Sequence, residues 1–192
     1  MRKILVLAGP SAVGKTTVMK KILEKHPEFE FIRSATTREK RQDAHESEYI
    51  YLSIEEFKKQ VSDGKMLEYT EFGGNLYGTP ASEIERIFDD GKIPLMILDI
   101  NGVKSLKLRP RDFITYAVYI LADICVLDAR LYERAVAEGL TEKAVAVFEK
   151  RKAANRRDIE SLSEMSALFN AKVINSDISD TADNIIRLFR SE

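Results

Sequence analysis

Residues 9–16 constrain the fold of this chain more than any other stretch. They read Gly9-Pro10-Ser11-Ala12-Val13-Gly14-Lys15-Thr16 and fit the pattern G-x-x-x-x-G-K-[ST] without a mismatch. Residues 3–8 before them form a short apolar run, which predicts a buried parallel strand. Residues 17–25 after them carry apolar side chains at a helical spacing. The pattern therefore has the strand–loop–helix context of a phosphate-binding loop, which we call the P-loop (residues 9–16).

The P-loop contains the residue types that polyphosphate binding requires. Gly9 and Gly14 allow tight turns that direct successive backbone N–H groups toward one ligand. The helix that begins beside Lys15 adds the positive end of its dipole. Lys15 supplies a point charge for the β- and γ-phosphates, and Thr16 offers a hydroxyl to Mg²⁺. We expect a nucleoside triphosphate with Mg²⁺ along Gly9, Pro10, Ser11, Ala12, Val13, Gly14, Lys15, Thr16 and Thr17.

The length and charge of the chain limit the classes of protein to which it can belong. A chain of 192 residues that is 44% hydrophobic predicts one compact α/β domain. Its 30 basic and 31 acidic residues leave a net charge of −1, which argues against a broad electrostatic grip on nucleic acid or an acidic membrane. The single cysteine, Cys125, excludes an intramolecular disulfide and suggests no metal cluster. Because the N-terminus leads directly into the first expected strand, without the pattern of a signal peptide or membrane span, we expect a cytoplasmic enzyme.

Five apolar segments alternate with helical segments along most of the chain. The expected strands are residues 3–8, 29–34, 94–99, 113–121 and 172–175. The alternation predicts a doubly wound parallel sheet with helices on its faces. Ligands of such sheets lie beyond the carboxyl ends of the strands, where Thr16, Ser34, Asp99 and Asn175 can converge. Residues 49–78 interrupt the alternation and predict a small β-rich lobe.

Local signals predict several helix boundaries. Ser53 and Glu56 form a capping-box pattern in front of a helix that runs to about residue 62. Thr79 is expected to cap a helix that has Pro80 in its first position. Further helices are expected over residues 17–25, 124–137 and 181–190, with one or two between 142 and 169. Residues 35–48 are polar and charged without an apolar period, which predicts a surface loop.

Polar residues outside the P-loop are candidates for a second ligand site. Arg38 and Arg41 can hold one phosphate with two planar sets of donors, or they belong to a solvated charged loop. Glu68 is suited to accept hydrogen bonds from a purine edge, with an exposed strand acid as the simpler alternative. Asp99 ends an apolar strand and either helps to hold Mg²⁺ through water or caps the next helix. Two aromatic residues with hydroxyl groups complete the set, Tyr49 and Tyr77.

The sequence resembles the guanylate kinase family from Ile4 to Phe189. The resemblance rests on seven stretches in family order: Gly9–Thr16, Ser34–Arg38 with Arg41, Glu48-Tyr49, Met66–Tyr69, Asn75–Pro80, Leu98–Ile100 with Gly102, and Val173–Asn175. It implies the P-loop nucleoside monophosphate kinase fold, in which helices flank a five-stranded parallel sheet with an inserted GMP-binding lobe and a helical lid. The implied division is a core of residues 1–34, 80–122 and 158–192, a nucleoside-monophosphate lobe of residues 35–79 and a lid of residues 123–157.

The resemblance also implies roles in the transfer of the γ-phosphate of ATP to GMP. The phosphate of GMP would be bound by Arg38, Arg41, Tyr49 and Tyr77. Guanine would be recognised by Ser34, Glu68, Thr79 and Asp99, with the two carboxylates accepting the N1 and N2 hydrogens. Asn175 would lie near the adenine of ATP, and Mg²⁺ would lie at Thr16 and Asp99. The implied catalytic residues are Lys15, Arg38, Arg41, Arg130, Arg134 and Arg151.

The chain departs from the family pattern at three places. Residues 42–48 contain no glycine, and Asn101-Gly102 replaces the usual Gln-Gly. In the lid, Arg130 and Arg134 lie four residues apart on one helix face and are alternatives for the usual arginines. Two other functions therefore stay open, a kinase of another small phosphorylated acceptor such as ribose 1,5-bisphosphate and a non-catalytic guanylate-kinase-like binding module. The intact P-loop argues against the binding module. The set of Glu68, Tyr77 and Thr79, which a ribose 1,5-bisphosphate kinase should not need, favours the kinase of GMP.

Overall fold

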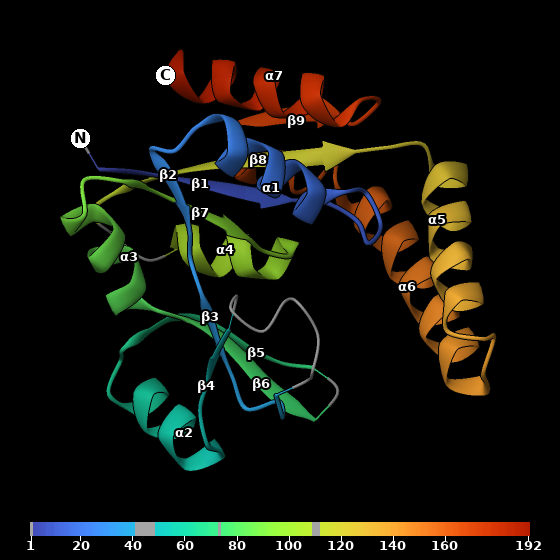
Figure 1. The fold of residues 1–192 in the computed structure, drawn as a ribbon, viewed down its shortest axis with the longest axis horizontal. Helices are drawn as coiled ribbons and strands as arrows, with labels where there is room; N and C mark the ends of the chain where they lie inside the picture. Colours follow the sequence, from blue (N-terminus) through green and yellow to red (C-terminus); the bar gives the residue numbers. More distant parts are fainter. Residues whose placement is uncertain (1, 41–48, 73, 109–111) are drawn as a thin grey trace.

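A five-stranded parallel sheet forms the centre of the molecule (Figure 1). The computed structural model describes residues 2–40, 49–72, 74–108 and 112–192. The strand order is β2–β7–β1–β8–β9, which confirms the predicted parallel sheet. The strands are β1 (Lys3–Ala8), β2 (Phe29–Phe31), β7 (Ile93–Ile97), β8 (Ile114–Leu121) and β9 (Ala171–Ile174).

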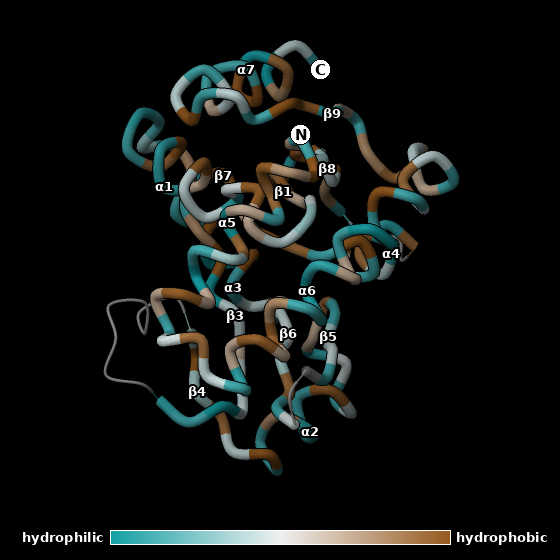
Figure 2. The backbone as a smooth tube through the Cα atoms, turned by 90° about the vertical axis from the view of Figure 1, so that its right-hand side faces the viewer, coloured by the Kyte–Doolittle hydropathy of each residue, from teal (hydrophilic) through white to brown (hydrophobic). Residues whose placement is uncertain are grey.

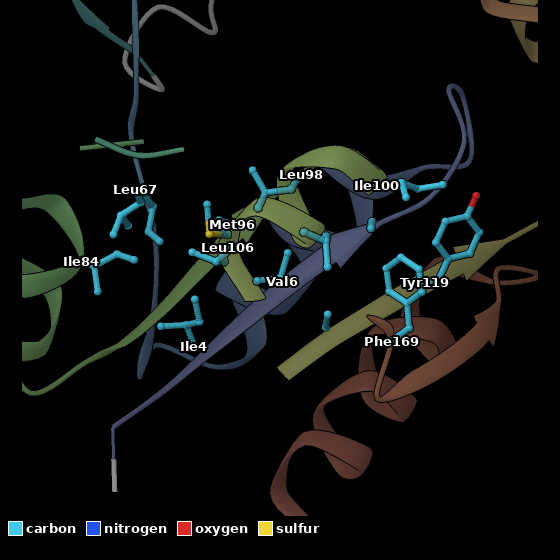
Figure 3. Packing of buried hydrophobic residues seen from close by; sticks show 14 of the residues in the cluster. Ile4, Val6, Leu67, Ile84, Met96, Leu98, Ile100, Leu106, Tyr119 and Phe169 are labelled. Carbon is cyan, nitrogen blue, oxygen red and sulfur yellow. The ribbon is translucent and has the colours of Figure 1, made fainter. Parts of the chain in front are cut away.

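Helices cover both faces of this sheet, so the side chains of β1 are buried on both faces. Ile4 and Val6 pack on the side of α3 and α4, whereas Leu5 and Leu7 pack on the side of α1 and α7. All four side chains are fully buried, which is why β1 reads as a continuous apolar run. Figure 2 shows the hydrophobic colouring of β1, and Figure 3 shows Ile4 and Val6 in their cluster. The helices are α1 (Lys15–Lys25), α3 (Ala81–Asp89), α4 (Ile100–Leu108) and α7 (Ile178–Arg190).

A second, four-stranded sheet forms the small lobe below the main sheet in Figure 1. Its order is β4–β3–β6–β5, and one face packs on α2 through Ala35, Phe57 and Met66. The helix α2 begins after the predicted capping box, in which Ser53 and Glu56 each accept a hydrogen bond from the other's backbone. The elements are β3 (Ser34–Thr36), β4 (Tyr49–Tyr51), α2 (Ile54–Ser62), β5 (Met66–Phe72) and β6 (Asn75–Pro80).

Two helices form a hairpin beyond the end of the main sheet, α5 (Ile124–Ala137) and α6 (Glu142–Ser161) (Figure 1). Asp123 and Thr141 cap their N-termini with side-chain oxygens. Ion pairs from Asp128 on α5 to Arg156 and Lys152 on α6, at 3.0 and 3.9 Å, join the two helices. A short 3-10 helix, η2 (Ser166–Leu168), follows α6, so the predicted segment 142–169 contains one long helix and one short one.

Several predicted boundaries were wrong. The expected strand 29–34 is divided, because β2 ends at Phe31 in the main sheet and Ser34 begins β3 in the small sheet. Thr79 does not cap a helix, because it lies inside β6 and its hydroxyl donates to Glu68 at 2.7 Å. Two helices begin earlier than predicted: α1 starts at Lys15, and α7 starts at Ile178 because Asp177 accepts hydrogen bonds from the backbone of its first turn.

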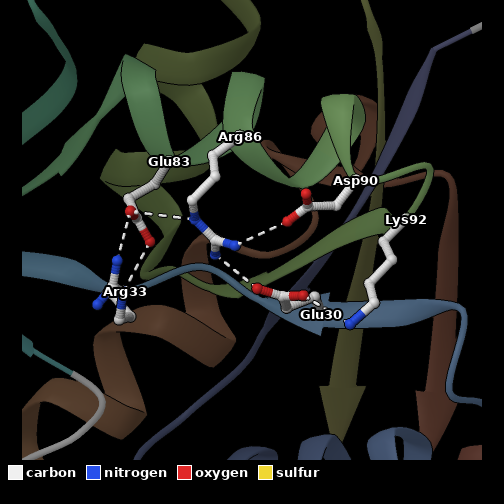
Figure 4. A network of polar contacts seen from close by, with 6 residues as sticks. All are labelled: Glu30, Arg33, Glu83, Arg86, Asp90 and Lys92. Carbon is white, nitrogen blue, oxygen red and sulfur yellow. Dashed lines mark hydrogen bonds and ion pairs between the residues drawn. The ribbon is translucent and has the colours of Figure 1, made fainter.

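A network of ion pairs joins the two places where the chain crosses between the lobes (Figure 4). Arg33 follows β2 on the way into the small sheet, and Glu83 lies in the first turn of α3 on the way back. The guanidinium of Arg33 donates twice to the buried carboxylate of Glu83, at 2.8 and 2.9 Å. Arg86 extends the network from Glu83 to Glu30, which also accepts from Lys92 at 2.8 Å.

Candidate active site

The P-loop follows β1 in a conformation that its two glycines make possible. Gly9 has a φ of 145°, and a Cβ atom there would lie 2.4 Å from the carbonyl oxygen of Ile120 on β8. Gly14 has a φ of 101°, and its Cβ would lie 2.7 Å from the amide nitrogen of Asn175. Ala12 also has a positive φ, 66°, without being glycine. The backbone of the P-loop is thus fixed by close approaches from the neighbouring strands.

The N-terminus of α1 is suited to bind an anion. No side chain caps this helix end, and no acidic residue lies in its first turn. The first N–H groups of an α-helix have no partner within the helix, and its dipole favours negative charge at this end. The side chains of Thr16 and Thr17 are exposed beside these groups. A phosphate placed here would meet backbone donors and two hydroxyls.

Lys15 lies folded over the P-loop. Its ammonium group donates to the carbonyl oxygens of Gly9 and Pro10 at 2.8 and 2.9 Å. Burial lowers the pKa of Lys15 from 10.5 to about 8, while the carboxylates of Asp158 and Asp99 oppose this shift and the charge of Arg134 adds to it. Two carboxylates and one arginine are therefore close enough to Lys15 to act on its charge.

Three side chains from distant parts of the chain bind the backbone of the P-loop. Asn175 donates to the carbonyl of Val13 at 2.7 Å and accepts from the hydroxyl of Thr181. Asn155 on α6 forms two hydrogen bonds with the backbone of Ser11. Arg130 on α5 donates to the carbonyl of Ala12 at 3.3 Å. The predicted position of Asn175 beside adenine stays a prediction, and its observed contacts are with the P-loop and with α7.

Asp99 lies next to the P-loop because β7 and β1 are neighbours in the sheet. Leu7 pairs with Ile97, and Leu98 donates its N–H to the carbonyl of Leu7. The exposed carboxylate of Asp99 accepts from the N–H of Gly102 at 2.7 Å, so it caps α4, one of the two roles predicted for it. This hydrogen bond uses one of its two oxygens and leaves acceptor capacity for a ligand.

Three of the four predicted guanine-reading residues form one row across the small sheet, whereas the fourth, Asp99, lies between β7 of the main sheet and α4. Ser34 pairs with Tyr49 on β4, and Glu68 on β5 pairs with Thr79 on β6. The register of β3 with β6, continued by one residue, sets Ser34 opposite Thr79. Paired residues of adjacent strands project from the same face, and Ala35 shows that the other face packs on α2. Residues separated by 45 positions in the sequence thus lie side by side.

Glu68 has an environment that sets it apart from a solvated strand acid. It is half-buried, and Thr79 donates its hydroxyl to the carboxylate at 2.7 Å. Burial raises the pKa of Glu68 above its usual value, the hydrogen bond from Thr79 opposes this rise, and the negative charge of Asp99 adds to it. The carboxylate of Asp99 is therefore close enough to Glu68 to act on its charge.

Arg38 lies among tyrosines one row further along the same face. Its guanidinium lies 5.3 Å from the ring centroid of Tyr49 and 5.8 Å from that of Tyr51, and it donates to the hydroxyl of Tyr51 at 3.2 Å. Tyr77 packs edge-on against Tyr49 at 6.4 Å. Tyr51 was not among the predicted site residues, although its alternation with Tyr49 is visible in the sequence. Arg41, the predicted partner of Arg38, lies outside the described residues.

The two arginines of α5 that were predicted to belong to a lid, Arg130 and Arg134, have different surroundings. Arg130 reaches the P-loop carbonyl of Ala12. Arg134, one turn further on, affects the charge on Lys15 and lines a small cavity between α5 and α6 together with Arg151. Arg134 therefore lies near Arg151 and is close enough to Lys15 to act on its charge.

Comparison with known proteins identifies the family. A family model described as guanylate kinase matches residues 1–192. This chain belongs to the guanylate kinase family. The guanylate kinase of Enterococcus faecalis is 34% identical over 191 residues, which cover 98% of this chain and 88% of that protein. The guanylate kinase of Prochlorococcus marinus is 32% identical over 194 residues, covering 99% and 98%. The crystal structure of guanylate kinase from Anaplasma phagocytophilum matches with a TM-score of 0.71 at 26% identity, covering 99% of this chain and 85% of that one.

Within this guanylate kinase fold, two residues that were not predicted act on the P-loop: Asn155 by hydrogen bonds to Ser11, and Asp158 by its charge near Lys15. Asn155 and Asp158 lie on one face of α6 with Arg151, and the only signal was their spacing from that arginine. Among the described residues, no helix is long and apolar enough to cross a membrane, and no three His, Cys, Asp or Glu side chains form a group that could hold a metal ion.

Proposed function

We propose that this protein is a cytoplasmic enzyme that transfers the γ-phosphate of ATP to GMP, giving ADP and GDP. The observation that carries the proposal is the row of Tyr49, Ser34, Thr79 and Glu68 on one face of the small sheet, with Arg38 beside it. The P-loop supplies one phosphate site, and Arg38 supplies a second. The family relationship adds the expectation that these two sites serve ATP and GMP.

Guanine recognition would follow from the hydrogen-bonding pattern of the row. Glu68 and Asp99 accept from N1–H and the exocyclic N2 of guanine, while Ser34 and Thr79 lie near its O6. Adenine lacks the N2 group and has an acceptor at N1. Binding adenine would leave carboxylates desolvated and unpaired, and sites built on such polar groups reject a ligand without the matching donors. Because burial already raises the pKa of Glu68, desolvation of this carboxylate is costly unless guanine pairs with it.

Phosphoryl transfer would then depend on position and charge. Lys15 and the arginines Arg134 and Arg151 neutralise the γ-phosphate of ATP, while Arg38 and Arg41 orient the phosphate of GMP toward it. Closure of the lid and the small lobe excludes water, which would otherwise hydrolyse ATP. The attacking phosphate oxygen is already a nucleophile at neutral pH, so no general base is needed.

Thr16 and Asp99 fit a magnesium ion that arrives with the triphosphate. Thr16 exposes its hydroxyl at the N-terminus of α1, and Asp99 is an exposed carboxylate next to the P-loop. Mg²⁺ in phosphoryl-transfer sites is commonly bound by one or two protein oxygens, with phosphate oxygens and waters completing the shell. When bound, the ion would neutralise charge on the β- and γ-phosphates.

A coupled assay of ADP formation tests the proposal. ATP is supplied with GMP, dGMP, AMP, UMP or ribose 1,5-bisphosphate, and GMP is expected to be the preferred ribonucleotide acceptor. Lys15→Ala is expected to abolish turnover, whereas Lys20→Ala, an exposed lysine of the same helix, is the matched control. Turnover of another acceptor without GMP would refute the choice of substrate. Turnover of none, with GMP still bound, would indicate a binding module.

A further inference from the structure

Asn155 is a buried asparagine in the middle of a charged helix. Its side chain is 1% exposed, although α6 contains mostly polar and charged residues around it. A buried side-chain amide is costly unless its donor and acceptor are both satisfied. Helix propensity gives no reason for asparagine at this position, because asparagine is a weak helix former away from the caps. The reason must lie in what the amide contacts.

The amide of Asn155 pairs with both polar groups of one P-loop residue. Its Oδ1 accepts from the N–H of Ser11 at 2.7 Å, and its Nδ2 donates to the carbonyl of Ser11 at 3.1 Å. The arrangement resembles the pairing of two strands and fixes the orientation of Ser11. Ala12 follows directly with a φ of 66°, a conformation that alanine adopts only when its surroundings impose it. Asn155 therefore helps to hold the P-loop in its phosphate-binding shape.

The same helix face carries the lid arginine. Arg151 precedes Asn155 by four residues and Asp158 follows it by three, so all three side chains project from one face of α6. Asp158 is near enough to Lys15 for each charge to affect the other. Arg156 on α6 is bonded to Asp128 on α5, so α5 and α6 are joined close to the same point. Asn155 is thus the direct hydrogen-bonded link between α6 and the P-loop among the described residues.

We propose that Asn155 is a positioning residue that ties α6 to the P-loop and thereby sets the place of Arg151 relative to the phosphates of the triphosphate substrate. The inference rests on the proposed function, because it takes ATP as the ligand of the P-loop. A purely structural role for Asn155 would affect stability and both substrates alike. A positioning role affects the triphosphate site and leaves the row of Ser34, Thr79 and Glu68 intact.

Two variants at one position and one control test this proposal. Asn155→Ala removes both hydrogen bonds, and Asn155→Asp keeps an acceptor for the N–H of Ser11 but loses the donor to its carbonyl. Asn170→Ala is the matched control, because its side chain also bonds a backbone N–H outside the P-loop, that of Ala117 in the middle of β8. Native folding of each variant is checked by far-UV circular dichroism and urea unfolding.

Steady-state kinetics distinguish a positioning role of Asn155 from a role in stability alone. Both Asn155 variants are expected to raise KM for ATP about tenfold, with a lower kcat and with KM for GMP changed less than about twofold, since two neutral hydrogen bonds are lost on the ATP side only. Asn170→Ala is expected to leave both KM values unchanged. Equal rises in KM for ATP and GMP, or unchanged values in both folded variants, would overturn the proposal.

The hydrogen-exchange arm needs no substrate, so it stays informative if the proposed reaction is wrong. Exchange of backbone amides in a peptide spanning residues 9–16 is followed by mass spectrometry in the free protein. Asn155→Ala is expected to speed exchange of this peptide, because the N–H of Ser11 loses its acceptor, while Asn155→Asp retains part of the protection. Unchanged exchange in Asn155→Ala would overturn the link itself. If Asn155→Ala speeds exchange of this peptide but the wild-type protein does not phosphorylate GMP, only the proposed function is contradicted and the link from Asn155 to the P-loop stands.

Discussion

Burial of the positive charge of Lys15 lowers the stability of the folded protein. Its ammonium group is drawn into the P-loop, where two backbone carbonyls bind it but little water reaches it. The pKa of about 8 means that the folded protein holds this proton less tightly than the unfolded chain does. The free enzyme thus carries a destabilising charge that the phosphates of a nucleotide would compensate.

The pH dependence of stability tests this view of Lys15. The pKa of Lys15 is lower in the folded protein than in the unfolded chain, so the full free-energy cost of its buried charge applies below about pH 8. This cost disappears as pH rises toward 10.5. Relative to Lys15→Met, the wild-type free energy of unfolding should therefore increase between pH 7 and pH 10, by at most about 3 kcal/mol. Urea titrations without nucleotide and in EDTA measure the difference. A difference that does not change with pH would contradict the low pKa.

Glu68 offers a residue-scale test of specificity. Glu68→Gln keeps the shape of the side chain but replaces one acceptor oxygen with a donor, which faces the donors of guanine. We expect kcat/KM for GMP to fall by about tenfold to a hundredfold, as for a lost charged hydrogen bond, with KM for ATP unchanged. Glu71→Gln on the same strand is the matched control, because Glu71 is exposed. Similar losses for Glu68→Gln and Glu71→Gln would exclude a specific contact of Glu68 with guanine.

At the scale of elements, the sequence predicted the features that depend on residues close together in the chain. The P-loop was recognised because its residue types and its flanking strand and helix lie within one segment, and α2 was recognised by its capping box at Ser53. The division of the expected strand 29–34 between two sheets was missed, since no turn residue separates the two pieces and only tertiary pairing does. Asn155 was missed for the same reason, because its partner Ser11 lies 144 residues away.

The helix α5 carries the prediction that belongs to this scale. The sequence could not choose between Arg130 and Arg134, whereas the structure engages Arg130 with the P-loop backbone and sets Arg134 beside Lys15 and Arg151. We expect Arg134→Met to lower kcat at least about a hundredfold, as for loss of a group that stabilises transition-state charge. Arg130→Met should mainly raise KM for ATP. Single-turnover measurements with both variants make the comparison, and a larger loss of kcat in Arg130→Met would reverse the assignment.

At the scale of the whole molecule, the chain joins the main sheet and the small lobe at two crossings. Arg33 and Glu83 connect these crossings directly (Figure 4). Burial alone would raise the pKa of Glu83, but the hydrogen bonds from Arg33 and Arg86 outweigh it and hold the pKa below its usual value. Ser34 and Thr79, the proposed guanine contacts, lie just inside the small sheet from these crossings. The ion pair is thus placed to limit how the GMP side of the site turns relative to the P-loop.

Removing Arg33 should therefore raise KM for GMP more than KM for ATP. Arg33→Met leaves Glu83 with Arg86 alone and should lower the free energy of unfolding by about 1 kcal/mol, a modest value because Arg33 is partly exposed. A lobe that samples more orientations spends less time in the one that binds GMP, so the apparent KM for GMP rises in proportion. KM for ATP should not change, because the P-loop and its contacts lie in the other lobe.

Steady-state kinetics with each substrate varied in turn, together with urea unfolding, measure both effects. Lys59→Met is the matched control, because Lys59 pairs with Asp63 on the exposed surface of α2 in the same lobe, where loss of an ion pair costs less than about 0.5 kcal/mol. A parallel rise in KM for ATP and GMP would mean that Arg33 only stabilises the fold. A rise confined to GMP would mean that the pairing of two crossings, distant in sequence, sets the orientation in which guanine is read.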